Sequence, residues 1–155
     1  MPAFGEHLKR YYPGLTPREE RVWRHWLVDH ESEFDSFLYN VHVGEGVRVT
    51  PAEMLKTDAV AAAIAESYRK ATQLKIDCVG IRGNDWWIFE VEDRARTATL
   101  GQLLVYAQLL PKAVAGIGPT ELAVVCRFIG PDMVEAFEEN GIVIFQVNVP
   151  AFPSP

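Results

Sequence analysis

The stretch LKIDCVGIRGNDWWIFEVE, residues 74–92, decides the fold of this 155-residue chain. Runs of β-branched and aromatic residues at 74–82 and 86–92 are typical of β-strands. Between them lies the turn-forming cluster at 83–85, Gly-Asn-Asp, so the whole stretch predicts a β-hairpin.

Carboxylates interrupt both predicted strands of this hairpin. Asp77 lies in the middle of the first strand, and Glu90 and Glu92 follow the apolar start of the second. A charge in a strand that faces the core is unfavourable unless it has a partner. Glu90 and Glu92 are two residues apart and therefore point to the same face of the sheet. These three acids are the first candidates for a functional site.

The register of the hairpin decides whether Asp77 joins the other two acids. A two-residue loop at 84–85 places Asp77 opposite Glu92, and a four-residue loop at 82–85 places it opposite Glu90. Both registers put the three carboxylates on one face. A three-residue loop would move Asp77 to the other face.

The rest of the chain alternates between helix and strand signals. Thr16-Pro17-Arg18-Glu19 is a capping box with proline at the first helical position, and it predicts a helix from about 17 to 30. The same pattern at residues 50–53 precedes an Ala-rich helix that reaches Lys70, with a break near 56–58. The remaining predicted elements are a strand at about 36–43, a helix at 97–110 stopped by Pro111, a strand at 121–128, a helix at 131–140 closed by Gly141 and a strand at 142–149.

This order predicts an α/β protein with a single mixed β-sheet flanked by helices. The length suits one domain over residues 1–155. Residues 1–15 are expected to form an N-terminal arm. The Pro-rich tail at 150–155 is expected to end the fold or to dock as an arm.

Composition excludes several classes of protein. The formal charge of −6 argues against a protein that coats nucleic acid. Much of the excess lies after residue 112, where the acids of the last helix form an expected solvated face. Cys78 and Cys126 lie in apolar runs and are expected to be buried thiols in a reducing compartment. No apolar run approaches the ~18 residues of a membrane span.

Three carboxylates close together repel one another unless a cation lies between them. Hard oxygen ligands of this kind suit Mg²⁺ or Mn²⁺. In the alternative interpretation, the acids meet water at the end of the sheet and pair with the basic residues Arg94, Arg96 or Lys75.

The motifs of this region resemble those of the PD-(D/E)xK nuclease superfamily. They are Asp77 in one strand, Glu90-Val-Glu92 in the next, and the helical Gln102-x-x-x-Tyr106. The chain is most similar to small members encoded by tailed bacteriophages, over about residues 17–128. The resemblance implies a restriction-endonuclease-like core of order αβββαβ, with the helix at 51–70 inserted after the first strand.

The resemblance also implies roles for these residues. Asp77 and Glu90 would be the ligands of Mg²⁺ or Mn²⁺, helped by the main-chain carbonyl of Val91. Gln102 and Tyr106 would line the site and position the nucleic-acid backbone.

The sequence departs from the superfamily at Glu92, where a lysine is usual. A glutamate there can act on the water or bind the metal. Lys75, Arg94 and Arg96 could supply the missing cation and bind nucleic acid.

Two functions follow from these observations. The first is a divalent-metal-dependent DNA nuclease that hydrolyses phosphodiester bonds in the host cytoplasm. The alternative is a catalytically degenerate nuclease fold used as a structural or adaptor subunit of a phage virion, such as the head–tail connector. Its partners would be phage structural proteins or further copies of the chain, and neither function involves a membrane.

Overall fold

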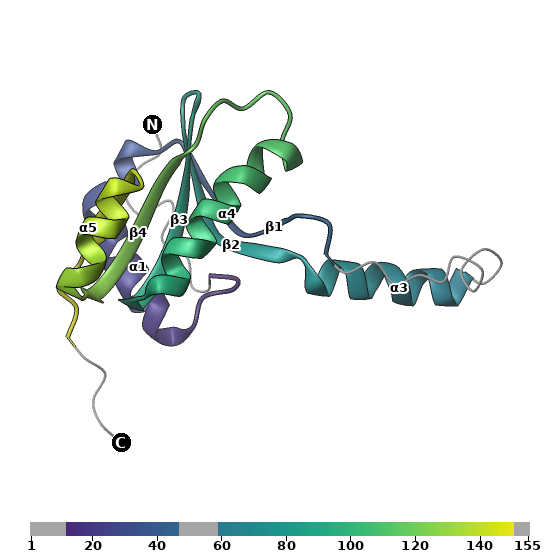
Figure 1. Ribbon diagram of the computed structural model, residues 1–155, viewed down its shortest axis with the longest axis horizontal. Helices are drawn as coiled ribbons and strands as arrows, with labels where there is room; N and C mark the ends of the chain where they lie inside the picture. Colours follow the sequence, from purple (N-terminus) through teal and green to yellow (C-terminus); the bar gives the residue numbers. More distant parts are fainter. Residues whose placement is uncertain (1–11, 47–58, 151–155) are drawn as a thin grey trace, which may run out of the picture.

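The computed structural model describes residues 12–46 and 59–150. A five-stranded sheet forms its centre, and helices lie on both faces (Figure 1). The elements are α1 (Pro17–His30), the 3₁₀ turn η1 (Glu31–Glu33), β1 (Ser36–Val43), α3 (Ala59–Thr72), β2 (Leu74–Arg82), β3 (Asp85–Ala95), α4 (Thr97–Ala113), β4 (Glu121–Ile129), α5 (Pro131–Glu139) and β5 (Ile142–Gln146).

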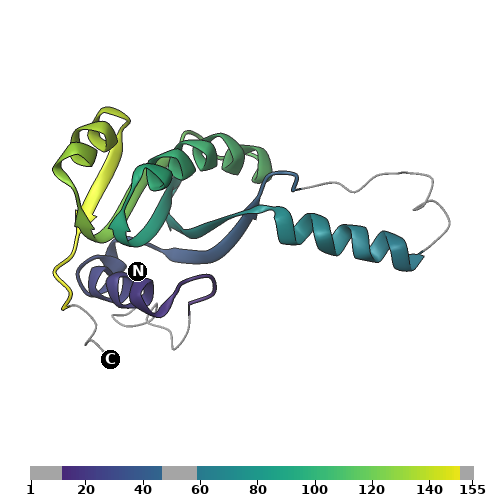
Figure 2. The same cartoon turned by 60° about the horizontal axis from the view of Figure 1, so that its bottom comes forward.

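The sheet is mixed, and its strands lie in sequence order from β1 to β5. β1, β2 and β3 are antiparallel neighbours, whereas β3, β4 and β5 run parallel to one another. Helix α1 covers one face, and α4 and α5 cover the other (Figure 2). Each face has its own cluster of buried apolar side chains. The predicted class, an α/β protein with a single mixed sheet flanked by helices, is confirmed.

Most element boundaries lie within two residues of the prediction, and three differ by three residues. β3 continues to Ala95, although the second strand of the hairpin was expected to end at residue 92. Pro111 does not stop α4, which continues to Ala113. A proline in the last turn removes one N–H donor at a point where few helical bonds remain to be made. β5 ends at Gln146, three residues earlier than expected.

The hairpin has a two-residue turn at Gly83-Asn84, because Arg82 pairs with Asp85. Gly83 adopts a positive φ of 58°, which such a tight turn requires. This loop has the two-residue length considered from the sequence, but it lies one residue earlier, at 83–84 instead of 84–85. It nevertheless gives the register in which Asp77 and Glu90 are the next pair beyond Cys78 and Phe89.

Strand β1 turns over at Asn40. Phe37 and Tyr39 pack on the α1 side of the sheet, whereas Val41 and Val43 pack on the α4 side. Regular alternation would keep all four on one face. Asn40 has a left-handed φ of 53°, which explains the reversal.

The partner strand turns over at the same level. Cys78 packs on the α1 side and Ile76 on the α4 side, and they pair with Tyr39 and Val41 respectively. Asp77 is therefore the residue opposite Asn40, at the point where the β1–β2 ribbon twists.

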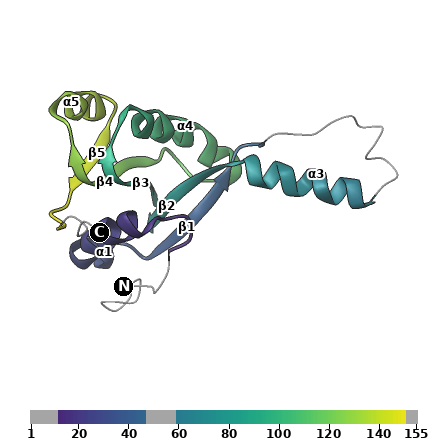
Figure 3. The ribbon, with the colours of Figure 1, turned by 90° about the horizontal axis from the view of Figure 1, so that it is seen from below.

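Helix α3 projects from the end of this ribbon, away from the sheet (Figures 1 and 3). It has no buried residue. The predicted insertion of a helix after the first strand is confirmed for Ala59–Thr72, and its expected start at residues 50–53 lies outside the described residues.

The core beneath α1 is aromatic. Trp23 and Trp26 are fully buried and stack with ring centroids 4.8 Å apart. Tyr12 and Leu15 are buried in the same cluster, so this part of the expected N-terminal arm belongs to the core. Cys78 and Cys126 are buried free thiols, as expected.

The expected acidic face of α5 is present, since its four carboxylates are exposed. Across residues 12–46 and 59–150, none of the helices combines the length and the apolar character needed to span a bilayer.

Candidate active site

The candidate site lies where β2 and β3 separate. Their paired residues end at Cys78 and Phe89. Beyond this point β2 stays paired with β1 as far as Leu74, and β3 stays paired with β4 as far as Ala95. The sheet therefore forks, and Asp77 and Glu90 are the first residues of its two branches.

At this fork, a side chain takes over from the backbone hydrogen bonds that join β2 and β3. Asp77 Oδ2 accepts a hydrogen bond of 2.9 Å from the backbone N–H of Val91. The backbone N–H of Asp77 acts to lower the pKa of Glu90, and the side chains of the two acids interact with each other. Asp77 is thus held by the facing strand, next to Glu90, before any ligand binds.

Glu90 is the most deeply buried of the acids. Its side chain is 3% exposed, and its Oε1 is buried with no hydrogen-bond partner. A buried carboxylate oxygen without a donor is unfavourable, and such atoms mark places where a ligand is missing or where function requires the group. Glu90 Oε1 is therefore the atom of the site that most needs a partner.

The electrostatics favour protonation of this pair. Burial, reinforced by the charges of Asp77 and Glu92, raises the pKa of Glu90 to about 10. Burial also raises the pKa of Asp77 to about 7, although the Val91 N–H acts in the opposite direction. Two carboxyl groups this close share a proton rather than ionise together.

Glu92 forms the edge of the site. Its Oε1 accepts a hydrogen bond of 3.4 Å from the hydroxyl of Thr99, at the start of α4. Burial and the charge of Glu19 raise its pKa, and the Thr99 hydroxyl and the guanidinium of Arg96 lower it. Of the three basic residues expected near the acids, Arg96 is the one whose charge acts on Glu92.

A fourth carboxylate, Glu19 of α1, completes the cluster. After burial, its charge contributes to the raised pKa of each of the three hairpin acids. In the sequence, Glu19 is fully explained by its capping box, where it accepts a hydrogen bond of 2.8 Å from the N–H of Thr16. Nothing in the local pattern could assign it to the site, because the approach of α1 to the fork depends on tertiary packing.

Tyr106 supports the site from α4. Its hydroxyl donates a 3.0 Å hydrogen bond to the backbone carbonyl of Lys75, two residues before Asp77. Burial and the charges of Glu90 and Asp77 raise its pKa well above the usual range, and the Gln102 side chain acts in the opposite direction. Gln102 itself is exposed. The structure thus brings this predicted pair together, with Tyr106 bound to β2 and Gln102 at the surface.

Lys75 and Arg94 are the other two basic residues expected near the acids. The Lys75 side chain is exposed. Arg94 stacks on Phe128, with its guanidinium carbon 4.1 Å from the ring centroid.

The donor set fits a hard divalent cation in part. Within the described residues, no three His, Cys, Asp or Glu side chains converge as a ready-made metal cage. Mg²⁺ is usually bound by one or two carboxylates together with water and substrate phosphates, so a full cage is not required. Asp77 and Glu90 provide two adjacent carboxylates, and the unpartnered Oε1 of Glu90 provides an open donor.

Comparison with known proteins gives little guidance to function. No family model matches the sequence, and no curated protein matches it. A crystallised protein of unknown function, AF1548, resembles the chain with a TM-score of 0.47 at 12% identity. The match covers 86% of this chain and 59% of that protein.

Proposed function

We propose that this protein is a divalent-metal-dependent nuclease that hydrolyses phosphodiester bonds in DNA. One observation carries the proposal: a buried carboxylate with an unpartnered oxygen, Glu90, lies against a second carboxylate, Asp77, at a fork in the sheet. A proton or a cation must neutralise this pair. The Gln102–Tyr106 helix beside it agrees with the PD-(D/E)xK resemblance.

In this proposal Asp77 and Glu90 would hold Mg²⁺ or Mn²⁺, which would supply charge stabilisation at the phosphoryl group and lower the pKa of water at the site. Glu92 accepts the proton of the attacking water. Burial raises the pKa of Glu92, which makes its carboxylate a stronger base. Thr99 fixes the Glu92 side chain, and Tyr106 fixes the strand that bears Asp77.

The test is cleavage of supercoiled plasmid DNA by the full-length protein with Mg²⁺ or Mn²⁺. Glu90→Gln keeps the shape of the side chain and removes its charge, and cleavage is expected to fall at least ~100-fold. Glu135→Gln, an exposed position on α5, is the matched control and is expected to cut normally. If the wild-type protein cuts no DNA with either metal, or Glu90→Gln cuts as well as wild type, the proposal is wrong.

A second candidate function is a structural or adaptor subunit, the alternative drawn from the phage resemblance. The projecting helix α3 favours it. Ile64 and Tyr68, one turn apart on α3, are 65% and 49% exposed, and large apolar side chains on a projecting element suit contact with other subunits. In this case the protein forms an assembly of its own copies, and Ile64→Ser/Tyr68→Ser reduces it to a monomer in sedimentation analysis. A wild-type monomer without assembly at high concentration contradicts this function.

A further inference from the structure

The outer edge of β5 is an open strand edge. Among the described residues, the sheet ends at β5, and no strand pairs with its outer side. Residues 142–149 contain no charged residue and no proline. Proteins usually protect such an edge with charge, proline or a bulge, because its unpaired N–H and C=O groups can bond to another strand. The sequence of β5 therefore leaves this edge open to an added strand.

The opposite edge of the sheet differs from β5. There, β1 turns over at Asn40, which has a left-handed φ of 53°. A reversal in the middle of an edge strand interrupts the regular row of backbone groups that a further strand would need. β5 contains no residue with a positive φ. Of the two edges, β5 is therefore the one suited to pairing.

The pairing with β4 fixes which backbone groups of β5 point outward. The two strands are parallel, and the N–H of Val147 donates a 2.8 Å hydrogen bond to the carbonyl of Cys126 in β4. Successive residues of a strand direct their backbone groups to opposite sides. Gln146, next to Val147, and Ile144, two residues before it, therefore direct their N–H and C=O groups away from β4. A further strand would bond to these groups.

A cavity lies beside β5 on the face of the sheet that α1 covers. Helix α1 packs over β3 and β4 and leaves this side of β5 partly uncovered. The cavity, called the β5 cavity below, has a volume of about 310 Å³, and its lining includes Trp26, Asp29 and His30 of α1 together with residues 145–148. One water occupies about 30 Å³ of liquid, so the β5 cavity has room for apolar side chains.

Aromatic rings form one wall of the β5 cavity. Trp26 stacks on His30 with ring centroids 4.7 Å apart, and Phe145 lies 5.5 Å from Trp26 and 5.1 Å from His30. The Nε1 of Trp26 is buried, and the described residues provide no hydrogen-bond partner for it. Side chains of a strand alternate between the two faces of a sheet. A strand added to β5 would therefore direct every second side chain toward these rings.

The charges near β5 are negative. Helix α5 packs on the other face of β5, at the end of the sheet opposite α3 (Figure 3). Its four exposed carboxylates are Asp132, Glu135, Glu138 and Glu139. No Lys, Arg or His follows Arg127 in the chain.

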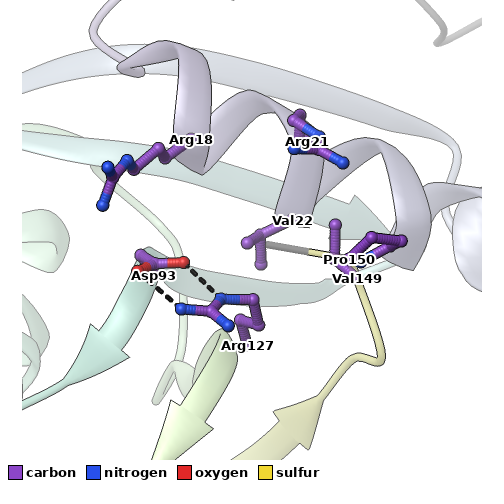
Figure 4. A pocket seen from close by; sticks show the side chains of 7 residues that line it. All are labelled: Arg18, Arg21, Val22, Asp93, Arg127, Val149 and Pro150. Atoms are coloured by element: carbon purple, nitrogen blue, oxygen red, sulfur yellow. Dashed lines mark hydrogen bonds and ion pairs between the residues drawn. The ribbon is translucent and has the colours of Figure 1, made fainter. Parts of the chain in front are cut away.

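The nearest arginines do not offset these acids. Arg127 is paired with Asp93 through a 2.7 Å hydrogen bond. Figure 4 shows Arg18 and Arg21 of α1 at a separate cavity, whose lining includes Val149, beyond the end of β5. Asp29 adds a carboxylate to the β5 cavity itself. Charge complementarity therefore favours a partner segment with basic residues.

A second copy of this chain is a poorer occupant. Antiparallel pairing of β5 with its own copy would follow a two-fold axis perpendicular to the sheet. Both α5 helices, each with its four carboxylates, would then lie on the same face, and their charges would repel one another. A basic segment meets attraction at the same place.

We propose that the outer edge of β5 binds an extended segment of a partner protein in which apolar residues alternate with lysine or arginine. The segment adds a strand to the sheet and bonds to the backbone of Ile144 and Gln146. Its apolar side chains lie in the β5 cavity, and its basic side chains lie on the side of α5. This surface is distinct from the acids at the fork, and the proposal does not depend on the nuclease function.

The test uses a short synthetic peptide of alternating lysine and valine, which is titrated into the isotopically labelled full-length protein and followed by NMR. The backbone amides of residues 142–148 and the indole N–H of Trp26 are expected to shift. The amides of Ile144 and Gln146 are expected to exchange more slowly with water. A peptide of alternating glutamate and valine has the same apolar side chains and is expected to bind at least ~10-fold more weakly.

One substitution separates backbone pairing from contact by side chains. Gln146→Pro removes an outward N–H, and an edge strand tolerates proline where the N–H faces away from the sheet. It is expected to weaken binding of the lysine peptide at least ~5-fold, the size of a lost hydrogen bond. Gln146→Ala loses the same side chain, keeps the N–H and is expected to bind like wild type.

The outcomes decide the proposal as follows. Shifts confined to β5 and the β5 cavity, with weaker binding for Gln146→Pro alone, support it. It is wrong if neither peptide shifts these resonances, if both peptides bind equally, or if Gln146→Pro binds as well as Gln146→Ala. Should Gln146→Pro fail to fold, the location of the wild-type shifts and the preference between the peptides decide alone. A dimer in sedimentation without peptide, with slowed exchange at Ile144 and Gln146, would assign the edge to a second copy and overturn the proposal.

Discussion

The side chain of Asp77 accepts a hydrogen bond of 2.9 Å from the backbone N–H of Val91, on the facing strand. In a regular hairpin that N–H would bond to a backbone carbonyl or point away. Here a carboxylate takes the place of the ladder, and it does so one residue after the regular pairing ends. The fork in the sheet and the acidic site are therefore the same structural feature.

The buried acid pair makes the stability of the metal-free protein depend on pH. The pKa of Glu90 is about 10 in the folded protein and near 4.5 when unfolded, so in this window the folded state binds a proton that the unfolded state has lost. The free energy of unfolding is highest below pH 4.5, the pKa of Glu90 in the unfolded chain, and it falls as the pH rises toward 10. In EDTA, the free energy of unfolding should decrease from pH 6 to pH 9, by denaturant titration. Glu90→Gln should be more stable than wild type at pH 8 by about 1–3 kcal/mol. A wild-type profile as flat as that of Glu90→Gln would contradict this account.

Metal binding should release protons from the same pair. Calorimetric titration with Mn²⁺ in two buffers of different ionisation enthalpy should detect about one proton released near neutral pH, and affinity should rise with pH. Asp77→Asn should weaken binding at least ~10-fold. Glu135→Gln serves as the control, because it removes an equal charge far from the fork. Heat signals that are identical for wild type and Asp77→Asn would show that the metal binds elsewhere.

Glu19 has two roles that different mutations can separate: it caps α1, and it adds negative charge to the acid cluster. Glu19→Gln preserves the capping box, since glutamine also accepts the hydrogen bond of Thr16, but removes a charge from the acid cluster. It should weaken Mn²⁺ binding with little change in stability. Thr16→Ala breaks the cap and leaves the charge, so it should cost about 1 kcal/mol of stability and leave Mn²⁺ affinity unchanged. The two variants are compared by calorimetry and by denaturant titration. If Glu19→Gln lowers stability and Thr16→Ala weakens Mn²⁺ binding instead, Glu19 is not part of the site.

Asn40 should tolerate glycine and not a β-branched residue. Its φ of 53° is accessible to asparagine and glycine, and a branched side chain is strained there. Asn40→Val should lower the free energy of unfolding by about 1–2 kcal/mol more than Asn40→Gly. Leu38→Val, an exposed position of the same strand, is the control for β-branching itself. Equal stability of Asn40→Val and Asn40→Gly would mean that the strand does not need its reversal.

The sequence predicted the elements well where the signal was local. The capping box at Thr16 and the hairpin turn at residues 83–85 depend on a few neighbouring residues, and both elements are present. Pro111 misled the prediction because its effect depends on how many helical bonds remain beyond it.

The candidate site was predictable only in part. The sequence singles out Asp77, Glu90 and Glu92 because a charged side chain in an apolar strand is unfavourable unless it has a partner. The alternation of side chains along a strand predicted only which face of the sheet Asp77 lies on. The reversal at Asn40 and the fork bring it to Glu90. Glu19 reaches the acids from a helix distant in sequence, and no spacing within one element reports such a contact.

The placement of α3 has a consequence for how the molecule moves in solution. A helix of 14 residues extends about 21 Å from the end of the β1–β2 ribbon, so the mass is not distributed as in a sphere. Rotational diffusion about the long axis should be faster than end-over-end tumbling. Nuclear spin relaxation should therefore give different correlation times for amides aligned with α3 and for amides perpendicular to it.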